Sequence, residues 1–452
     1  MSNYDPNDGF SDFTEMLRRA EAQDRQRPSR PAEPDPVERR RRRRRGRVAG
    51  LVVGLVVLAV VGTYIPLALT APIGAAASTV HRPDVTPPAA TTLAMPPEGE
   101  SALSVAGADD YLGASASGIL ASSGGDSPLP IASISKLITA MVVLDAKPLR
   151  SGAGPTLTFD KADHALYDKY YLLNATIAAM PTGSTMSEHD AIETMLVVSA
   201  CNYAEAIADW AFGSNAGFVS ATKRWLKAHG LGGTTMVEPT GIDDRNTSTP
   251  SDLIAIGKLA MANPAVAEIV AKIRLDVPAL GGLPNTNDLL GSDGINGIKT
   301  GTLDSAGSDL LFSATMSVGT STPLTIIGVV LGGDTHSSVN ADVRALLTSL
   351  GSGFHEVSLA TEGQQVGTYS TPWGSKATMV LGSSASVFTW SNTPITSTMT
   401  TTTLKTGADG EKVGTVTWKA GKNTVSVPVV LKGSIKPPSA WWRLTHPQQL
   451  WK

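Results

Sequence analysis

Cysteine is almost absent from this chain: Cys201 is the single cysteine among 452 residues. One thiol excludes an intramolecular disulfide, so the packing of the core must supply the stability of the fold. The seven histidines show no metal-ligand spacing such as His-Glu-x-x-His, and we expect neither a metal nor an organic cofactor. The length exceeds that of one ordinary domain, which predicts a large core and a smaller module.

Charge is unevenly distributed. The whole chain has a net charge of −3, but residues 1–47 contain 13 basic against 9 acidic side chains. Residues 1–38 are polar, contain proline and have few aromatic residues, so they cannot bury enough surface to fold alone. We expect residues 1–47 to form a disordered cytoplasmic tail that ends in a run of arginines.

A long apolar run follows this tail. Residues 48–70 carry no charge over about the length of a bilayer-spanning helix, and residues 39–45 are all arginine. The positive-inside rule then places the N-terminus in the cytoplasm and everything after residue 70 outside the membrane. A cleaved signal peptide is the alternative, since residues 75–78 are small, although the long polar leader favours an uncleaved anchor. The arginines are interpreted as a topology signal and a contact for anionic lipid, so no nucleic-acid partner is expected.

The first candidate for chemistry is the pair Ser133 and Lys136. Three residues is about one helical turn, so a hydroxyl and an amine at this spacing can lie side by side. If Ser133 begins the helix, its backbone N–H is free to bind an oxyanion, and the helix dipole favours the negative charge there. The spacing alone is weak evidence, because Ser220 and Lys223 repeat it.

Two further motifs follow in the chain. Ser199 and Cys201 end an apolar run, and a Lys-Thr-Gly motif stands at residues 299–301. Ser-x-x-Lys, then Ser-x-Asn or a variant, then Lys-Thr-Gly is the motif set of penicillin-binding proteins and class A β-lactamases. Residues 101–350 therefore resemble the serine-type D-alanyl-D-alanine carboxypeptidases, the low-molecular-mass penicillin-binding proteins. The run Glu-Pro-Thr-Gly at residues 238–241 also resembles a turn of that family.

The resemblance implies an α+β fold for residues 101–350: a β-lactamase/DD-peptidase-like transpeptidase domain, with an antiparallel sheet and helices on both its faces. The pattern of the residues agrees with this expectation. Helical periodicity is clear at residues 134–144 and 188–210, and strand-like runs stand at residues 310–316 and 324–331. Lys299 is expected on the strand that lines the cleft.

The resemblance also implies catalytic roles. Ser133 would attack the carbonyl of the penultimate D-alanine in a peptidoglycan stem peptide that ends in D-Ala-D-Ala. Lys136 would take the proton in its neutral form, which desolvation and the charge of nearby Lys299 would favour. Ser199 would relay the proton to the leaving amine, helped by Lys299. β-Lactam antibiotics would acylate the same serine.

Substrate binding is expected from the third motif. Thr300 and Thr302 would offer hydroxyls to the terminal carboxylate of the substrate, and Gly301 would keep the strand edge free of a blocking side chain. The backbone N–H groups of Ser133 and Thr302 would form the oxyanion hole.

Cys201 departs from the family pattern, in which an asparagine usually stands at this position and Asn202 is one residue away. Because a thiol forms weaker hydrogen bonds than an amide, the substrate's peptide carbonyl would be held less well. Cys201 is therefore a candidate substrate-binding residue, and its thiol bears on both substrate affinity and the rate of acylation. A buried small residue and a catalytic thiol paired with a histidine are the other interpretations.

Two repeats of these motifs are interpreted as structural. Ser220 and Lys223 follow the second motif and fall on the outer face of an amphipathic helix. A second Lys-Thr-Gly begins at Lys405 and runs into a turn signature between two strand-like segments.

Three other functions remain open. A β-lactamase would need a deacylating base, for which Glu238 is the nearest candidate. A DD-transpeptidase would use the same acyl-enzyme with an amine acceptor, and a silent cell-wall-binding protein is the alternative that is not an enzyme. Product analysis and labelling with a fluorescent penicillin distinguish them.

The remaining segments suggest no chemistry. Residues 71–100 form a stiff linker rich in proline and threonine. Residues 351–435 alternate polar and apolar side chains between turns, which predicts a small all-β module that acts as a spacer or contacts the cell wall. In the tail, residues 436–452, Trp441, Trp442 and Trp451 either pack against that module, the interpretation we favour, or touch the bilayer interface.

Overall fold

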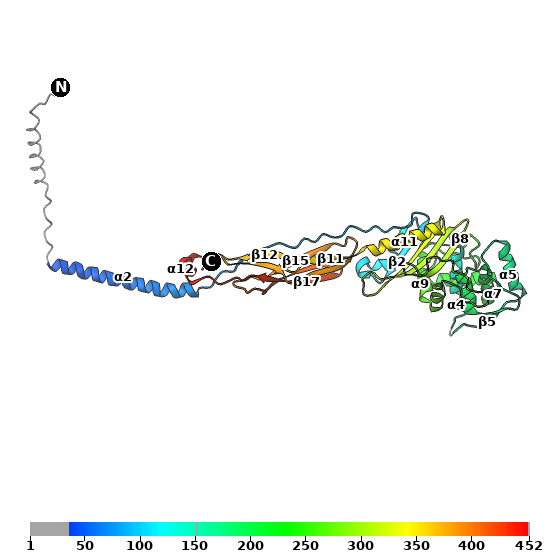
Figure 1. The fold of residues 1–452 in the computed structure, drawn as a ribbon, viewed down its shortest axis with the longest axis horizontal. Helices are drawn as coiled ribbons and strands as arrows, with labels where there is room; N and C mark the ends of the chain where they lie inside the picture. The colour runs from blue at the N-terminus through cyan, green and yellow to red at the C-terminus, as the bar shows by residue number, and fades with distance from the viewer. Residues whose placement is uncertain (1–35, 150–151, 451–452) are drawn as a thin grey trace, which may run out of the picture. The chain divides into compact units, whose positions relative to one another are not determined.

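The computed structural model describes residues 36–149 and 152–450 (Figure 1). These residues divide into two compact units. The first contains the described residues up to Ala76, together with Thr371–Ser375 and the residues from Lys436 onward, and the second contains Ala77–Ser370 and Lys376–Ile435. Residues 1–35 of the predicted tail (1–47) and Trp451 lie outside the described residues.

The first unit is built on one long helix, α2 (Pro36–Thr70). Its stretch Arg40–Thr70 is long and apolar enough to cross a membrane, and its most apolar part is not buried within the structure. The helix begins at Pro36, so the arginine run that we expected in the tail is also helical. Arginine has a high helix propensity, which permits the helix to continue through this run.

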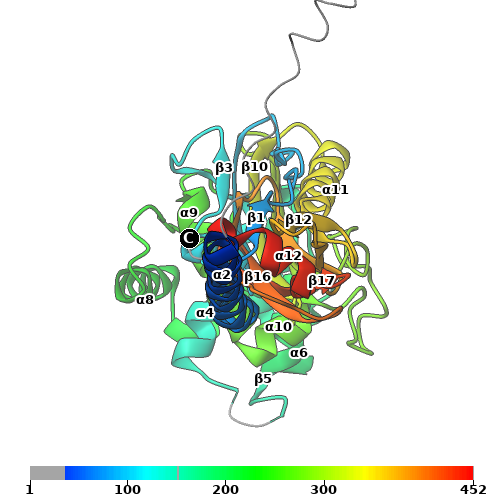
Figure 2. The same cartoon turned by 90° about the vertical axis from the view of Figure 1, so that its left-hand side faces the viewer.

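The C-terminal helix α12 (Ala440–Thr445) packs on the end of α2 (Figure 2). Arg443 Nη1 donates to the carbonyl oxygen of Ala71 at 2.7 Å and to that of Ala68 at 3.4 Å. The last carbonyl groups of a helix have no partner within the helix, and a cation is favoured beside them. Tyr64 adds a hydrogen bond from its hydroxyl to the Leu444 carbonyl at 2.6 Å.

The packing of α12 on the end of α2 also places Trp442. Trp442 packs edge-to-face against Trp373, with ring centroids 5.6 Å apart, and it also packs against the small apolar cluster at the end of α2. Trp441 is 75% exposed. Trp442 therefore contacts Trp373, which stands within the predicted module, and also the end of α2, a partner that the sequence pattern did not suggest.

The second unit contains a five-stranded sheet in which every pair of neighbours is antiparallel. Each strand supplies side chains to both faces because successive residues alternate. In spatial order the strands are β3 (Ala121–Ser123), β2 (Glu100–Ala106), β10 (Leu324–Gly333), β9 (Gly307–Met316) and β8 (Ile295–Leu303).

Helices cover both faces of this sheet. Leu311 of β9 faces a large core built mainly from helices, whereas its neighbours Leu310 and Phe312 face a second core closed by α11. The expected α+β architecture is thus present. The other helices are α3 (Asp109–Leu112), α4 (Ser135–Ala146), α5 (Lys161–Leu172), α6 (Glu188–Val197), α7 (Cys201–Phe212), α8 (Asn215–Ala228), α9 (Pro250–Ala262), α10 (Pro264–Val270) and α11 (His336–Ser352).

The helical pattern predicted over residues 188–210 is divided into α6 and α7. Ser187 is the N-cap of α6, and its side chain accepts a hydrogen bond from the backbone N–H of Asp190. The break lies at residues 198–200, where Ser199 adopts a positive φ of 70°. The chain therefore turns at the second sequence motif.

Short elements complete this part of the unit: η1 (Ala114–Ser117), β4 (Leu129–Pro130), η2 (Ala132–Ile134), β5 (Thr156–Thr158), β6 (Thr185–Ser187) and β7 (Thr247–Ser248).

The C-terminal part of the second unit consists of β-strands. The predicted linker contributes the edge strand β1 (Ala77–Val80) to a six-stranded sheet in the order β1, β12, β13, β17, β16, β15. The exposed Lys405 lies in the segment between β15 and β16. The remaining strands are β11 (Phe354–Ala360), β12 (Gln365–Ser370), β13 (Lys376–Leu381), β14 (Ala385–Trp390), β15 (Ile395–Thr401), β16 (Lys412–Ala420) and β17 (Asn423–Lys432), and η3 (Pro447–Gln449) follows α12 in the first unit.

Candidate active site

Ser133 lies in the turn η2, directly before α4. The preceding residue, Ala132, has a positive φ of 41°, which is unusual for a residue with a Cβ atom. Gly241 permits this bend, because a Cβ atom there would lie 1.8 Å from the Ala132 carbonyl oxygen. The bend brings Ser133 to the wall of a pocket of about 850 Å³.

Lys136 lies one turn further along and is completely buried. Its Nζ atom donates to Ser133 Oγ at 2.8 Å and to the Thr240 carbonyl oxygen at 2.7 Å. The hydroxyl and the amine therefore lie side by side, as their spacing predicts. A neutral amine at this distance can instead accept the hydroxyl proton, which is the geometry that activates a serine nucleophile.

Glu238 stabilises the turn that supplies the Thr240 carbonyl. Its carboxylate accepts the backbone N–H groups of Thr240 and Gly241, both at 2.6 Å, and the side-chain amide of Asn246 at 3.0 Å. Glu238 is thus engaged in its own turn, which explains the Glu-Pro-Thr-Gly run structurally. This arrangement does not favour the β-lactamase alternative, in which Glu238 would activate a water molecule.

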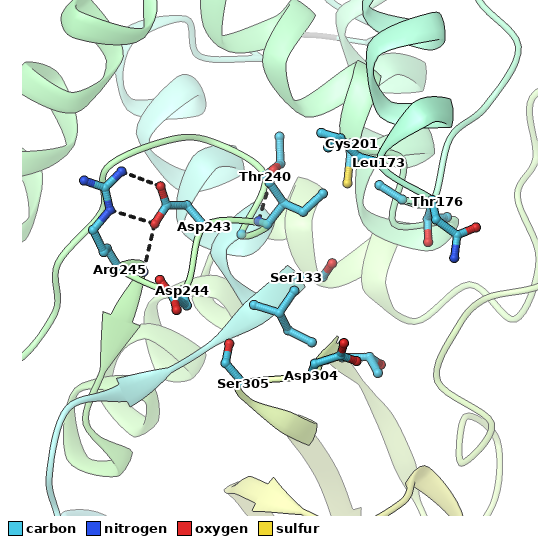
Figure 3. A pocket seen from close by; sticks show the side chains of 16 residues that line it. Ser133, Leu173, Thr176, Cys201, Thr240, Asp243, Asp244, Arg245, Asp304 and Ser305 are labelled. Carbon is cyan, nitrogen blue, oxygen red and sulfur yellow. Dashed lines mark hydrogen bonds and ion pairs between the residues drawn. The ribbon is translucent and has the colours of Figure 1, made fainter.

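The second motif lines the pocket through its cysteine. Cys201 is the first residue of α7, and its sulfur points into the pocket that Ser133 lines (Figure 3). Ser199 is buried two residues earlier, and its hydroxyl has no hydrogen-bond partner among the described residues. Asn202 cannot replace the missing asparagine, because its side-chain amide is buried and bonds both backbone groups of Ala178.

Lys299 lies on the edge strand β8 and is 1% exposed. Burial, together with the charge of Lys136 and against an opposing effect of Cys201, lowers the pKa of Lys299 to about 7. Lys299 Nζ donates to the Thr300 carbonyl oxygen at 3.2 Å and to Thr286 Oγ1 at 3.4 Å. Two amines and one thiol thus share a single buried region.

Thr286 is a site residue that no sequence motif indicated. Its hydroxyl lies 2.6 Å from that of Thr300. The contact places the loop before β8 beside the third motif and orients one of the two hydroxyls that we expected to bind the carboxylate of the substrate.

Gly301 also lies in a tight contact with the turn before α4. A Cβ atom at this position would lie 3.0 Å from the Ile131 carbonyl oxygen, 3.2 Å from Ala132 Cβ and 3.1 Å from Asp309 Oδ2. The glycine therefore lets β8 approach the turn that carries Ser133. Burial raises the pKa of the neighbouring Asp309 to about 8, and its Oδ2 atom has no hydrogen-bond partner within residues 36–149 and 152–450.

The pocket has a polar and charged rim. Figure 3 shows Ser133 between Thr240 and Cys201 on one side and the loop containing Asp304 and Ser305 on another. Thr302 also lines it. At the far end Arg245 pairs with Asp243 at 2.5 Å and holds the pKa of that carboxyl at about 2.

The repeated motifs lie elsewhere. Ser220 and Lys223 are exposed on α8, and neither lines the pocket.

His189, Asp190 and Glu193 form a cluster with metal-ligand atoms close together, but Lys272 already pairs with Glu193 at 2.7 Å.

The fold is that of known penicillin-binding proteins. Penicillin-binding protein 6B from Escherichia coli superimposes with a TM-score of 0.51 at 20% identity, covering 77% of this chain and 98% of that one. Penicillin-binding protein 5 from Haemophilus influenzae gives a TM-score of 0.50 at 18% identity, covering 79% of this chain and 100% of that one. These likenesses define the class of fold.

The family follows from the sequence. The model of the D-alanyl-D-alanine carboxypeptidase family matches residues 108–335, about half of the chain, and the chain belongs to this family. A D-alanyl-D-alanine endopeptidase from Pseudomonas aeruginosa is 30% identical over 207 residues, which is 44% of this chain and 64% of that protein. The chain spans 57–64% of the length of the first curated relatives it matches.

Proposed function

We propose that this protein is a membrane-anchored serine D-alanyl-D-alanine carboxypeptidase that trims peptidoglycan stem peptides outside the cytoplasm. The observation that carries the proposal is the 2.8 Å contact between Lys136 Nζ and Ser133 Oγ, in a chain of this family. Two further observations support it: Thr302, directly after the third motif, lines the pocket with Ser133, and the charge of Lys136 acts on Lys299.

The proposed reaction has two steps. Ser133 Oγ attacks the carbonyl of the penultimate D-alanine while neutral Lys136 takes its proton, and an ester to Ser133 forms. The bond to the terminal D-alanine breaks, and the proton reaches the leaving amine through Ser199. Water then hydrolyses the ester, which releases the shortened peptide and restores the serine hydroxyl.

The residues around the serine supply charge and donors. The backbone N–H groups of Ser133 and Thr302 form the proposed oxyanion hole. The hydroxyls of Thr300 and Thr302 bind the terminal carboxylate, and cationic Lys299 attracts it. Cys201 faces the substrate with a weak hydrogen-bonding group, so we infer slower acylation than an asparagine would give.

Localisation is part of the proposal. The apolar stretch of α2 supports a single membrane span, and the arginines before it favour a cytoplasmic N-terminus. Protease digestion of intact cells tests the orientation: the folded part after α2 should be accessible from outside, and protection of that part would contradict the proposal.

Release of D-alanine from a peptide ending in D-Ala-D-Ala tests the activity. The detergent-solubilised full chain should release D-alanine, Ser133→Ala should release none, and Ser220→Ala, which alters the repeated motif on α8, should retain full activity. D-alanine release by Ser133→Ala at the wild-type rate would contradict the proposal.

The same assay separates the alternatives. Added amine acceptors produce a new amide if the protein is a transpeptidase. Cleavage of a dimeric peptide at an internal D-alanyl bond would indicate endopeptidase activity, which is the activity named for the Pseudomonas aeruginosa relative. An unreactive wild type would favour the silent wall-binding alternative.

A further inference from the structure

Thr302 contacts a side chain that lies outside all three sequence motifs. Its Oγ1 atom lies 2.6 Å from Nε2 of His336, a residue 34 positions further along the chain. Thr302 and Ser133 line the same pocket. The contact therefore places an imidazole within hydrogen-bond distance of a hydroxyl that is proposed to bind the terminal carboxylate of the substrate.

His336 is held in place by the start of α11. It is the first residue of this 17-residue helix, and the preceding Thr335 forms a capping box with Ser338. The buried face of α11 packs into the core of the sheet through Val339, Val343 and Leu346. The ring therefore extends from an anchored backbone and not from a free loop.

The direction of this hydrogen bond decides what Thr302 can do. A threonine hydroxyl has one hydrogen and two lone pairs. If Thr302 donates to Nε2, its hydrogen is used, and only lone pairs face the substrate carboxylate. If Nε2–H donates to Thr302 Oγ1, the hydroxyl hydrogen remains free for the carboxylate.

The surroundings of His336 contain charges of both signs. Burial lowers the pKa of His336, and Lys299 lowers it further, whereas the charge of Asp288 acts in the opposite direction. The ring is therefore mainly neutral at neutral pH, and one of its nitrogens carries the hydrogen. A carboxylate bound at Thr302 favours the form with the hydrogen on Nε2.

We propose that His336 is a positioning residue for substrate selectivity: its Nε2–H donates to Thr302 Oγ1 and thereby directs the Thr302 hydroxyl to the free carboxylate of the substrate. This inference rests on the proposed function and deepens it. It assigns the preference for a peptide with a free carboxyl end partly to a residue on α11, outside the three motifs.

The test uses two substitutions of His336 in the full chain that are isosteric with each other. His336→Gln keeps an N–H donor near Thr302, whereas His336→Glu offers only acceptors and forces Thr302 to donate away from the substrate. Kinetics are measured with two peptides, one ending in D-Ala-D-Ala with a free carboxylate and one ending in its amide. Thermal unfolding of each variant is measured in parallel as a control for folding.

His336→Gln should stay close to the wild type with both peptides. His336→Glu should raise KM for the free acid about tenfold or more with little change in kcat, and should leave the amide almost unaffected. In a Thr302→Val background the difference between the Gln and Glu variants should shrink, since the hydroxyl that connects His336 to the substrate is gone.

Two outcomes contradict the inference in distinguishable ways. A wild type that releases D-alanine, with equal selectivity for acid over amide in the Gln and Glu variants, would overturn the role of His336 alone. A difference between Gln and Glu that persists unchanged in the Thr302→Val background would also overturn it. A wild type that releases no D-alanine would overturn the proposed function, and this inference with it.

Discussion

The Lys136 amine and the Ser133 hydroxyl form a hydrogen bond of 2.8 Å, with both residues fixed by the same turn and helix. Lys136 is completely buried, and its other contact is the Thr240 carbonyl oxygen. Lys223, the lysine of the repeated motif on α8, is exposed and therefore lacks this environment.

Replacement of this lysine should abolish most of the reactivity of the serine. Lys136→Met keeps much of the side-chain volume but removes the base, and we expect acylation by a fluorescent penicillin to slow by about 10²- to 10⁴-fold. The matched control is Lys223→Met, which removes the lysine of the repeated motif. Equal acylation rates in the two variants would show that Lys136 is not the base.

The charge of Lys299 should appear in the pH dependence of substrate binding. Burial and Lys136 lower the pKa of Lys299 to about 7, so the amine is cationic below that pH and neutral above it. The KM for a peptide with a free carboxylate should therefore rise as the pH passes through about 7. Lys299→Arg, which stays cationic, should remove this rise, and the same rise in Lys299→Arg would assign the titration to another group.

Cys201 offers a substitution that should increase activity. Cys201→Asn places an amide where the sulfur now lines the pocket, and one added hydrogen bond to the substrate should speed acylation about 3- to 10-fold. The rate constant for acylation divided by the penicillin dissociation constant measures this effect. An unchanged or lower value would show that Cys201 does not contact the substrate carbonyl.

The buried carboxyl of Asp309 should make stability depend on pH. Burial raises the pKa of Asp309 from 3.8 to about 8, so the folded state binds more protons than the unfolded state between these pH values. The free energy of unfolding therefore falls as the pH rises through this window. Asp309→Asn should be more stable than the wild type near pH 8, by about 1–4 kcal/mol, and should lose this advantage near pH 4.

Chemical denaturation at both pH values measures this difference. Asp145→Asn, which changes an exposed carboxylate, serves as the control and should show no comparable dependence on pH. If the free energy of unfolding of Asp309→Asn differed from that of the wild type by the same amount at both pH values, Asp309 would be ionised in the folded protein.

The sequence predicted those features that depend on short spacings. The one-turn separation of Ser133 and Lys136 is a property of the local helix, and the strand-like run at residues 310–316 lies within β9. The helices on both faces of the sheet were expected from the family resemblance and are present. The order of the three motifs along the chain was sufficient to suggest the family, which the comparison confirms.

Other features depend on contacts between distant segments, which no local pattern encodes. His336 and Thr286 reach the third motif from α11 and from a loop, and neither stands in a recognisable spacing with it. The close approach of Gly301 in β8 to the turn before Ser133 is likewise a contact between distant segments. The break between α6 and α7 arises at Ser199, a residue type that gives no strong signal for a positive φ.

The most direct test of the account is the mass of the protein after reaction with a β-lactam, followed by mass spectrometry of the modified peptide. We predict one covalent adduct on Ser133 in the wild type and in Ser220→Ala, and none in Ser133→Ala. An adduct that persists in Ser133→Ala, or one located on Ser199 or Cys201, would contradict the assignment of Ser133 as the nucleophile.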